Sequence, residues 1–137
     1  MFVAQTQIRV RYAETDQMGY VYYGNYSTYY EVARVEAFRA LGMSYKELEQ
    51  QGVMMPILEN HSRYLAPALY DDLLTIKVSI PSRPNIRIQF HYEIFNQSNK
   101  LIHTGETHLV FVNQETRKPC KIPNEMERLL NPYFDEK

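Results

Sequence analysis

With 137 residues, 45% of them apolar and 23% charged, the chain has the size and composition of one globular domain, so we expect residues 1–137 to form a single domain. Its formal net charge of −1 supplies no polybasic field and disfavours nucleic acid as a partner. The one cysteine, Cys120, forbids an internal disulfide and no apolar run approaches the roughly 20 residues of a transmembrane helix, so we expect a cytoplasmic protein with no membrane span.

The first part of the chain predicts one strand followed by one long helix. Apolar and basic residues alternate over Thr6–Tyr12, which is the two-residue period of a strand with one buried face. From Tyr26 onward, apolar residues recur at spacings of three and four, the pattern of a helix of about 17 residues. Asn25 is a candidate N-cap, and Gly42 follows the last apolar position as a C-terminal stop.

The rest of the chain predicts a short helix and then strands. Ser44–Gln51 is amphipathic, and Gly52 ends it. Pro56 marks an edge or a bulge in the extended segment that follows. Glu125–Leu130 could make one or two helical turns near the C-terminal end. The strands are expected over Val53–Leu65, Leu73–Ile80, Ile86–Ile94 and Leu101–Val112, the last two forming a hairpin.

This order of elements predicts an α+β fold in which one long central helix is wrapped by a five-stranded antiparallel sheet. We expect the four later strands to follow one another through consecutive antiparallel connections. A sheet wrapped around one helix leaves its edges exposed, and a second copy of the chain could continue the sheet across that edge. The sequence therefore predicts a homodimer or a homotetramer.

Six of the twelve tyrosines lie between residues 20 and 30, directly after a loop that contains Asp16 and Gly19. In one interpretation Asp16 starts a turn, Gly19 takes a positive φ, and the tyrosines fill a core that lacks tryptophan. In the other, the Asp16 carboxylate lies beside the first N–H groups of the long helix, which carry the positive end of its dipole. Such donors can stabilise an oxyanion.

One motif carries a family resemblance. It covers Val10–Tyr26, which reads VRYAETDQMGYVYYGNY, and continues with YEVAR over Tyr30–Arg34. Two weaker elements follow, RYLAPALYDD over 63–72 and KPCKIP over 118–123. Together they resemble the hotdog-fold acyl-CoA thioesterases of the 4-hydroxybenzoyl-CoA thioesterase type, and the resemblance covers most of the chain.

The resemblance implies a hotdog thioesterase domain that hydrolyses an acyl thioester of coenzyme A, or of acyl carrier protein, to a free acid and a thiol. It implies that Asp16 acts as nucleophile or as general base, and that the backbone amide of Tyr23, flanked by that of Gly24, polarises the thioester oxygen. Related enzymes carry a histidine or a tyrosine where Tyr23 stands, so no side-chain acid is expected nearby. Coenzyme A is part of the substrate, and no separate cofactor is implied.

The other reactive residues form weaker candidate sites. Four histidines, with no metal-binding motif, fall on different predicted strands or far apart along one, so no metal site is expected. Cys120 has no evident base. Glu31 and Arg34 lie three residues apart on the predicted helix, and we expect them to form an ion pair or to have a packing role rather than a catalytic one. Arg83 and Arg87 are candidates for the phosphates of coenzyme A, or simply solvated charges. The histidines are His61, His91, His103 and His108.

Two other functions compete with hydrolysis. Hydration of an enoyl thioester, another hotdog reaction, would require a catalytic histidine on the long helix, and that segment has none. A hotdog dimer could also bind acyl thioesters without catalysis. The tyrosines would suit either an aromatic acyl group or an aliphatic chain, so the acyl preference stays open.

Overall fold

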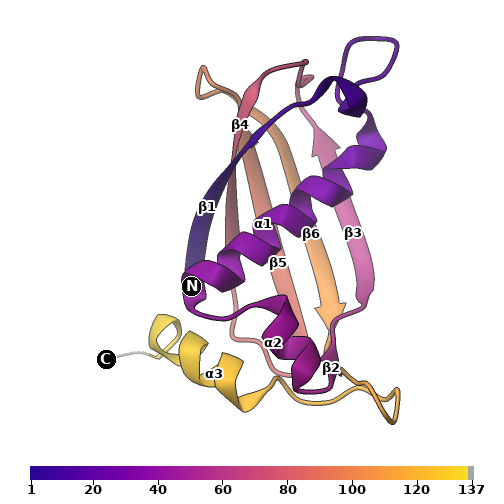
Figure 1. Cartoon of the computed structure of the whole chain (residues 1–137). Coiled ribbons are helices and arrows are strands. Elements are labelled where there is room, and N and C mark those ends of the chain that lie inside the picture. Colours follow the sequence, from indigo (N-terminus) through magenta and orange to yellow (C-terminus); the bar gives the residue numbers. More distant parts are fainter. Residues whose placement is uncertain (136–137) are drawn as a thin grey trace.

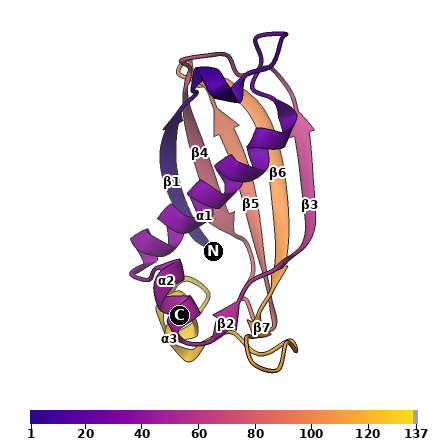
Figure 2. The same cartoon turned by 45° about the vertical axis from the view of Figure 1, so that its right-hand side comes forward.

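A 16-residue helix, α1 (Tyr26–Leu41), lies across one face of a five-stranded antiparallel sheet in the computed structural model, which describes residues 1–135 (Figure 1). The predicted α+β fold class is confirmed. Figure 2 shows α1 running diagonally over the inner face of the sheet, so that one helix covers most of that face. The strands of the sheet are β1 (Phe2–Arg9), β3 (Ile57–Tyr64), β4 (Leu73–Ile80), β5 (Arg87–Phe95) and β6 (Leu101–Val110).

Short helices and strands lie at the two ends of the layers formed by α1 and the sheet. The two-residue strands β2 and β7 pair with each other, and the helix α3 lies near the start of β1 (Figure 1). There the N-terminal ammonium of Met1 donates a hydrogen bond of 2.6 Å to the carbonyl of Tyr133. No helix of residues 1–135 is long and apolar enough to cross a bilayer. The short elements are η1 (Tyr12–Glu14), η2 (Tyr23–Asn25), α2 (Tyr45–Gln50), β2 (Val53–Met54), β7 (Val112–Asn113), α3 (Asn124–Leu130) and η3 (Asn131–Tyr133).

The strand order corrects the predicted connections. The order across the sheet is β1-β4-β5-β6-β3, so β3 pairs with β6 and not with β4, which follows it in the chain. The connection after β3 passes the beginning of β6, where the N–H groups of Leu65 and Ala66 both donate to the carbonyl of Ile102. Alternating hydrophobicity specifies the buried face of a strand but not its neighbour, which is why the prediction of consecutive pairing was wrong.

The core lies between α1 and the inner face of the sheet. Every second residue of β4 and β5 is buried there against one face of the helix, the pattern that the sequence predicted. Gly42 ends α1 as expected, with φ at 108° and its N–H bonded to the carbonyls of Phe38 and Arg39. The largest fully buried side chains are Tyr29, Tyr30, Tyr92, Phe38, Phe90, Phe111, Leu74, Ile76, Ile80, Ile88, Ile94 and Ile102.

The helix start differs from the prediction at Asn25. Its side chain makes no capping bond to α1 and donates instead, through Nδ2, to the carbonyl of Glu14 at 2.8 Å. The 3₁₀ turn η2 runs directly into α1, so Asn25 already has helical φ and ψ and cannot serve as a side-chain cap. The first exposed N–H groups of this helical segment therefore belong to Tyr23 and Gly24.

The surroundings of Arg34 distinguish between the two roles considered for Glu31 and Arg34, an ion pair and a packing role. It is 5% exposed, and its guanidinium donates to the hydroxyls of Tyr92 at 3.0 Å and Tyr45 at 3.2 Å. Glu31 lies on the exposed side of α1. Arg34 therefore has a packing role and joins α1 to β5 and α2.

Candidate active site

The loop between η1 and η2 is a tight, internally bonded turn. Thr15 and Val21 form an isolated antiparallel bridge. Within it the N–H of Asp16 donates to the carbonyl of Tyr20 at 2.8 Å, and the N–H of Gly19 donates to the carbonyl of Asp16 at 2.9 Å. Gly19 has a φ of 81°, as predicted, and a side chain there would be strained. The loop therefore fixes the backbone of Asp16.

The two carboxylate oxygens of Asp16 have different surroundings. Oδ1 accepts hydrogen bonds from the N–H of Met18 at 2.9 Å and of Tyr20 at 3.3 Å. Oδ2 accepts no hydrogen bond from any of residues 1–135. The side chain is thus held through one oxygen, while the other is free to face a reacting group.

The start of the helical segment supplies unpaired backbone donors. Tyr23 and Gly24 are the first residues of η2, and their N–H groups donate to no carbonyl within the described chain. Both stand at the positive end of the η2–α1 helical segment, where a negatively charged oxygen is stabilised.

A cavity of about 340 Å³ brings these two features together. Asp16 and Tyr23 both line it, and most of the remaining wall is apolar or aromatic. A mostly apolar wall with a few convergent polar groups is typical of a site for a small molecule. The other lining residues are Met18, Tyr20, Val21, Tyr26, Tyr64, Leu65, Ala66 and Pro67.

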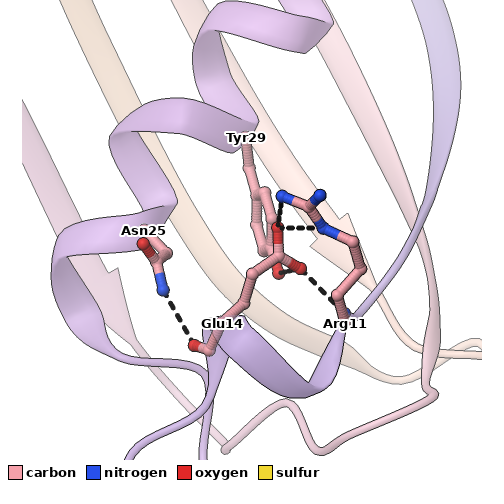
Figure 3. A network of polar contacts seen from close by, with 4 residues as sticks. All are labelled: Arg11, Glu14, Asn25 and Tyr29. Atoms are coloured by element: carbon pink, nitrogen blue, oxygen red, sulfur yellow. Dashed lines mark hydrogen bonds and ion pairs between the residues drawn. The ribbon is translucent and has the colours of Figure 1, made fainter.

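A buried carboxylate beside the loop was missed in the sequence. Glu14 accepts hydrogen bonds from the backbone and guanidinium of Arg11 and from the hydroxyl of Tyr29 (Figure 3). Burial acts to raise the pKa of Glu14, but these donors outweigh it and hold the pKa below its ordinary value. The Arg11–Glu14 spacing of three residues, inside the motif and ending two residues before Asp16, was the available signal.

His103 lies behind the cavity wall as a neutral side chain. It is fully buried, its ring stacks on Tyr26 with centroids 4.1 Å apart, and its Nε2 is hydrogen-bonded to the hydroxyl of Tyr30. Burial lowers the pKa of His103 to about 4, so the ring is uncharged at neutral pH. It is a core histidine and does not line the cavity.

The remaining histidines gather on the outer face of the sheet, which the sequence did not predict. His61 and His91 are both register partners of Glu106 on β6, the strand between β5 and β3. Nε2 of His91 lies 3.3 Å, and Nε2 of His108 lies 3.5 Å, from Oε2 of Glu106. Because the pairing of β3 with β6 was not foreseen, neither was this cluster. Among residues 1–135 no group of three His, Cys, Asp or Glu side chains is placed to hold a metal ion.

That face also contains the larger cavity, of about 610 Å³. It is lined by residues of β3, β4, β5 and β6, and Asp16 is not among them. Cys120, the other reactive side chain considered above, is half-buried and packs against the core. The lining residues are His61, Ser62, Arg63, Lys77, Ser79, His91, Tyr92, Glu93, Thr104, Gly105 and Glu106.

Arg83 and Arg87 lie at the opposite end of the sheet from Asp16 in the same chain. Arg87 is the register partner of Val110, seven residues along β6 from His103, which is about 24 Å at 3.4 Å per residue. Arg83 is bonded to Asn131 and Asp135, whereas Arg87 is exposed and makes no ion pair with the rest of residues 1–135. The structure therefore does not bring either arginine to the Asp16 cavity of its own chain.

Comparison with known proteins gives consistent matches. Residues 10–130 match the family model of the Thioesterase-like superfamily. The acyl-CoA thioester hydrolase YbgC of Escherichia coli is 34% identical over 116 residues, which are 85% of this chain and 87% of that protein. YneP of Bacillus subtilis is 33% identical over 88% of each chain. The crystal structure of the DHNA-CoA thioesterase of Staphylococcus aureus superposes with a TM-score of 0.85 at 36% identity, covering 98% of this chain and 85% of that one.

Proposed function

The chain belongs to the Thioesterase-like superfamily, and from that membership and the geometry of the loop we propose how it cleaves its substrate. It is an acyl-CoA thioesterase that hydrolyses an acyl thioester to a free acid and coenzyme A. The predicted resemblance to hotdog thioesterases is confirmed. The observation that supports the mechanism best is that Asp16, with one oxygen held and one free, lines the same cavity as Tyr23.

In the proposed reaction the thioester oxygen lies against the N–H of Tyr23, flanked by that of Gly24. As the carbonyl carbon becomes tetrahedral, negative charge develops on this oxygen, and preorganised donors stabilise it more than they stabilise the ground state. A donor of this kind contributes about 3 to 4 kcal/mol to the transition state in comparable sites. The amide, and not the phenol of Tyr23, has this role.

The free oxygen of Asp16 either attacks the thioester carbonyl carbon or activates a water molecule that does so. As a nucleophile, Oδ2 forms a mixed anhydride with the acyl group and expels the thiolate, and water then cleaves the anhydride. As a general base, Oδ2 takes a proton from water while the water oxygen attacks the same carbon. A single turnover in H₂¹⁸O that releases an unlabelled acid and leaves the label on Asp16 shows the first route, with water attacking the carboxyl carbon of Asp16, because the second route always puts the label into the acid.

The leaving group requires no acid from the protein. A thiol has a reference pKa of roughly 8.5, so coenzyme A departs as a thiolate far more readily than an amine or alkoxide would. This agrees with a cavity in which the neutral, enclosed His103 lies behind the wall. The coenzyme is part of the substrate, and the proposed reaction proceeds without a separate cofactor.

We also propose that the protein is located in the cytoplasm, because its single cysteine suits a reducing compartment.

We further propose a homodimer that forms along β3. This strand is at the edge of the sheet, and Ile57, Leu58 and Tyr64 on and around it are 48–52% exposed. An unpaired edge with apolar side chains is a template for pairing with another chain. Light scattering after size exclusion should give twice the mass of the chain, and a single-chain mass would contradict this.

Antiparallel pairing of two β3 strands would also account for Arg83 and Arg87 as phosphate ligands. It brings the arginine end of one protomer to the Asp16 end of the other, since β3 runs the full length of the sheet. Arg87→Ala should then raise KM for acyl-CoA and leave KM for the matching acyl-pantetheine unchanged. Arg128→Ala, on α3, is the matched control. Equal effects on both substrates would contradict the assignment.

The mechanism is tested with Asp16→Asn and acyl-CoA substrates with short, long and aromatic acyl groups. The variant should fold and bind substrate in calorimetry, yet lose most thiol release, because the amide can neither attack nor take a proton. Asp71→Asn makes the same chemical change in an exposed loop and should keep its rate. Near-parental hydrolysis by Asp16→Asn would contradict the mechanism. Binding without any hydrolysis by the parent protein would indicate a non-catalytic binding protein.

A further inference from the structure

Glu14 is an enclosed carboxylate that the reaction itself does not use. It is 9% exposed, and its two oxygens accept four hydrogen bonds from Arg11 and Tyr29 (Figure 3). Oε1 accepts from the N–H of Arg11 at 2.8 Å and the hydroxyl of Tyr29 at 2.9 Å. Oε2 accepts from Nε and Nη2 of Arg11 at 3.2 and 3.1 Å. Such a carboxylate is costly to bury unless its partners are all in place.

These contacts join the two halves of the catalytic site. Through its side chain Glu14 is bound to Tyr29, one turn inside α1, and through its carbonyl it accepts from the N–H of Tyr22 at 2.9 Å and from Nδ2 of Asn25 at 2.8 Å. Tyr22 and Asn25 flank the oxyanion donors in the chain. Glu14 is therefore tied to the helical segment on both sides of those donors.

Asp16 is only two residues from Glu14 along the chain. The intervening Thr15 is held as well, because its hydroxyl donates to the carbonyl of Tyr12 at 2.8 Å and its backbone pairs with Val21. A movement of Glu14 relative to α1 would thus shift Asp16 relative to the amide of Tyr23. The separation of these two groups decides whether Asp16 can reach the carbonyl carbon while the amide of Tyr23 binds the carbonyl oxygen.

We propose that Glu14 is a positioning residue, whose carboxylate clamps the Asp16 loop to the start of the helix and so sets the distance between Asp16 and the backbone amide of Tyr23. This inference rests on the proposed function. It assigns a mechanistic role to a side chain that touches neither substrate nor reacting atoms.

Glutamine is the informative substitution because it keeps the size and shape of the side chain. In Glu14→Gln the amide NH₂ must face either the guanidinium or the N–H of Arg11, which are donors themselves, so one side of the clamp is lost. The substrate cavity gains and loses no group. We therefore expect kcat to fall about 10- to 100-fold while KM for acyl-CoA changes by less than about twofold.

Two control variants separate positioning from simple loss of stability. Glu31→Gln makes the same chemical change on the exposed side of α1 and should leave kcat unchanged. Leu130→Ala removes a buried side chain of α3, at the other end of the fold, and should lower the melting temperature while the folded protein keeps its kcat. All rates are measured at a temperature where circular dichroism shows each variant fully folded.

A second substitution covers the case in which Glu14→Gln does not fold. Tyr29→Phe keeps the ring in the core and removes one of the four bonds to Glu14, and should lower kcat about 3- to 10-fold at constant KM. The inference is overturned if both variants keep kcat within twofold of the parent, or if Leu130→Ala loses as much kcat as they do. Asp16→Asn, assayed in parallel, reports on the proposed function separately, since retained turnover there would remove the mechanism whatever Glu14 does.

Discussion

The ring of His103 lies flat on the ring of Tyr26, with centroids 4.1 Å apart and planes within 8° of parallel. Tyr26 lines the Asp16 cavity, so this stack connects the cavity wall to strand β6. His103 is also bonded to Tyr30 through Nε2, and its Nδ1 has no hydrogen-bond partner within residues 1–135. An imidazolium at this place would be desolvated with nothing to compensate its charge.

His103 should therefore make stability fall as the pH is lowered. Its pKa in the folded protein is about 4, below the unfolded reference of about 6.5, so from about pH 6.5 down to pH 4 the unfolded chain binds a proton that the folded one does not. The parent should lose about 2 kcal/mol more than His103→Gln between pH 7.5 and pH 5, as measured by urea unfolding. Parallel pH curves for the two proteins would contradict this.

Arg34 and Glu31 should respond very differently to substitution, although they are one turn apart on α1. Arg34→Met leaves the hydroxyls of Tyr92 and Tyr45 without their buried donor and should lower the free energy of unfolding by about 1 to 3 kcal/mol. Glu31→Gln, on the exposed side, should change it by less than about 0.5 kcal/mol. Urea denaturation measures both changes. Equal losses of unfolding free energy in the two variants would contradict the packing role and indicate an ion pair between Glu31 and Arg34.

The larger cavity on the outer face of the sheet should be dispensable for hydrolysis. It is lined by His91 and Glu106 but not by Asp16. His91→Ala and Glu106→Gln should each keep kcat/KM for acyl-CoA within about twofold of the parent, the range expected when no transition-state contact is removed. A loss of kcat/KM of a hundredfold or more in either variant would indicate that the reaction takes place on the outer face of the sheet and would contradict our account.

The sequence predicted the features that depend on local pattern. The spacing of apolar residues in α1, Gly42 at its end and Gly19 in the loop each follow from a local rule, and the structure shows all three. The local pattern allowed Asp16 beside the N–H groups of the helix start as one of two interpretations. The amides of Tyr23 and Gly24 and the hydrolytic role of Asp16 came from the family resemblance, which the comparisons support at the level of family and activity.

What the sequence missed depends on contacts between distant segments. The pairing of β3 with β6 sets His61 and His91 on either side of Glu106, and no local pattern specifies that neighbour. Asn25 was predicted to be a helix cap because the pattern did not reveal the 3₁₀ turn η2, of which Asn25 is the last residue. Glu14 was part of the quoted motif, but its bond to Tyr29, 15 residues away, exists only once α1 packs beside η1.

The central claim is that the thioester lies between Asp16 and the amide of Tyr23, and a crystal structure of Asp16→Asn with an intact acyl-CoA tests it most directly. The thioester oxygen should lie about 2.7–3.1 Å from the nitrogen of Tyr23, with the carbonyl carbon about 3–3.5 Å from the side chain at position 16. A thioester bound in the outer-face cavity, or one whose oxygen points away from Tyr23 and Gly24, would contradict the account.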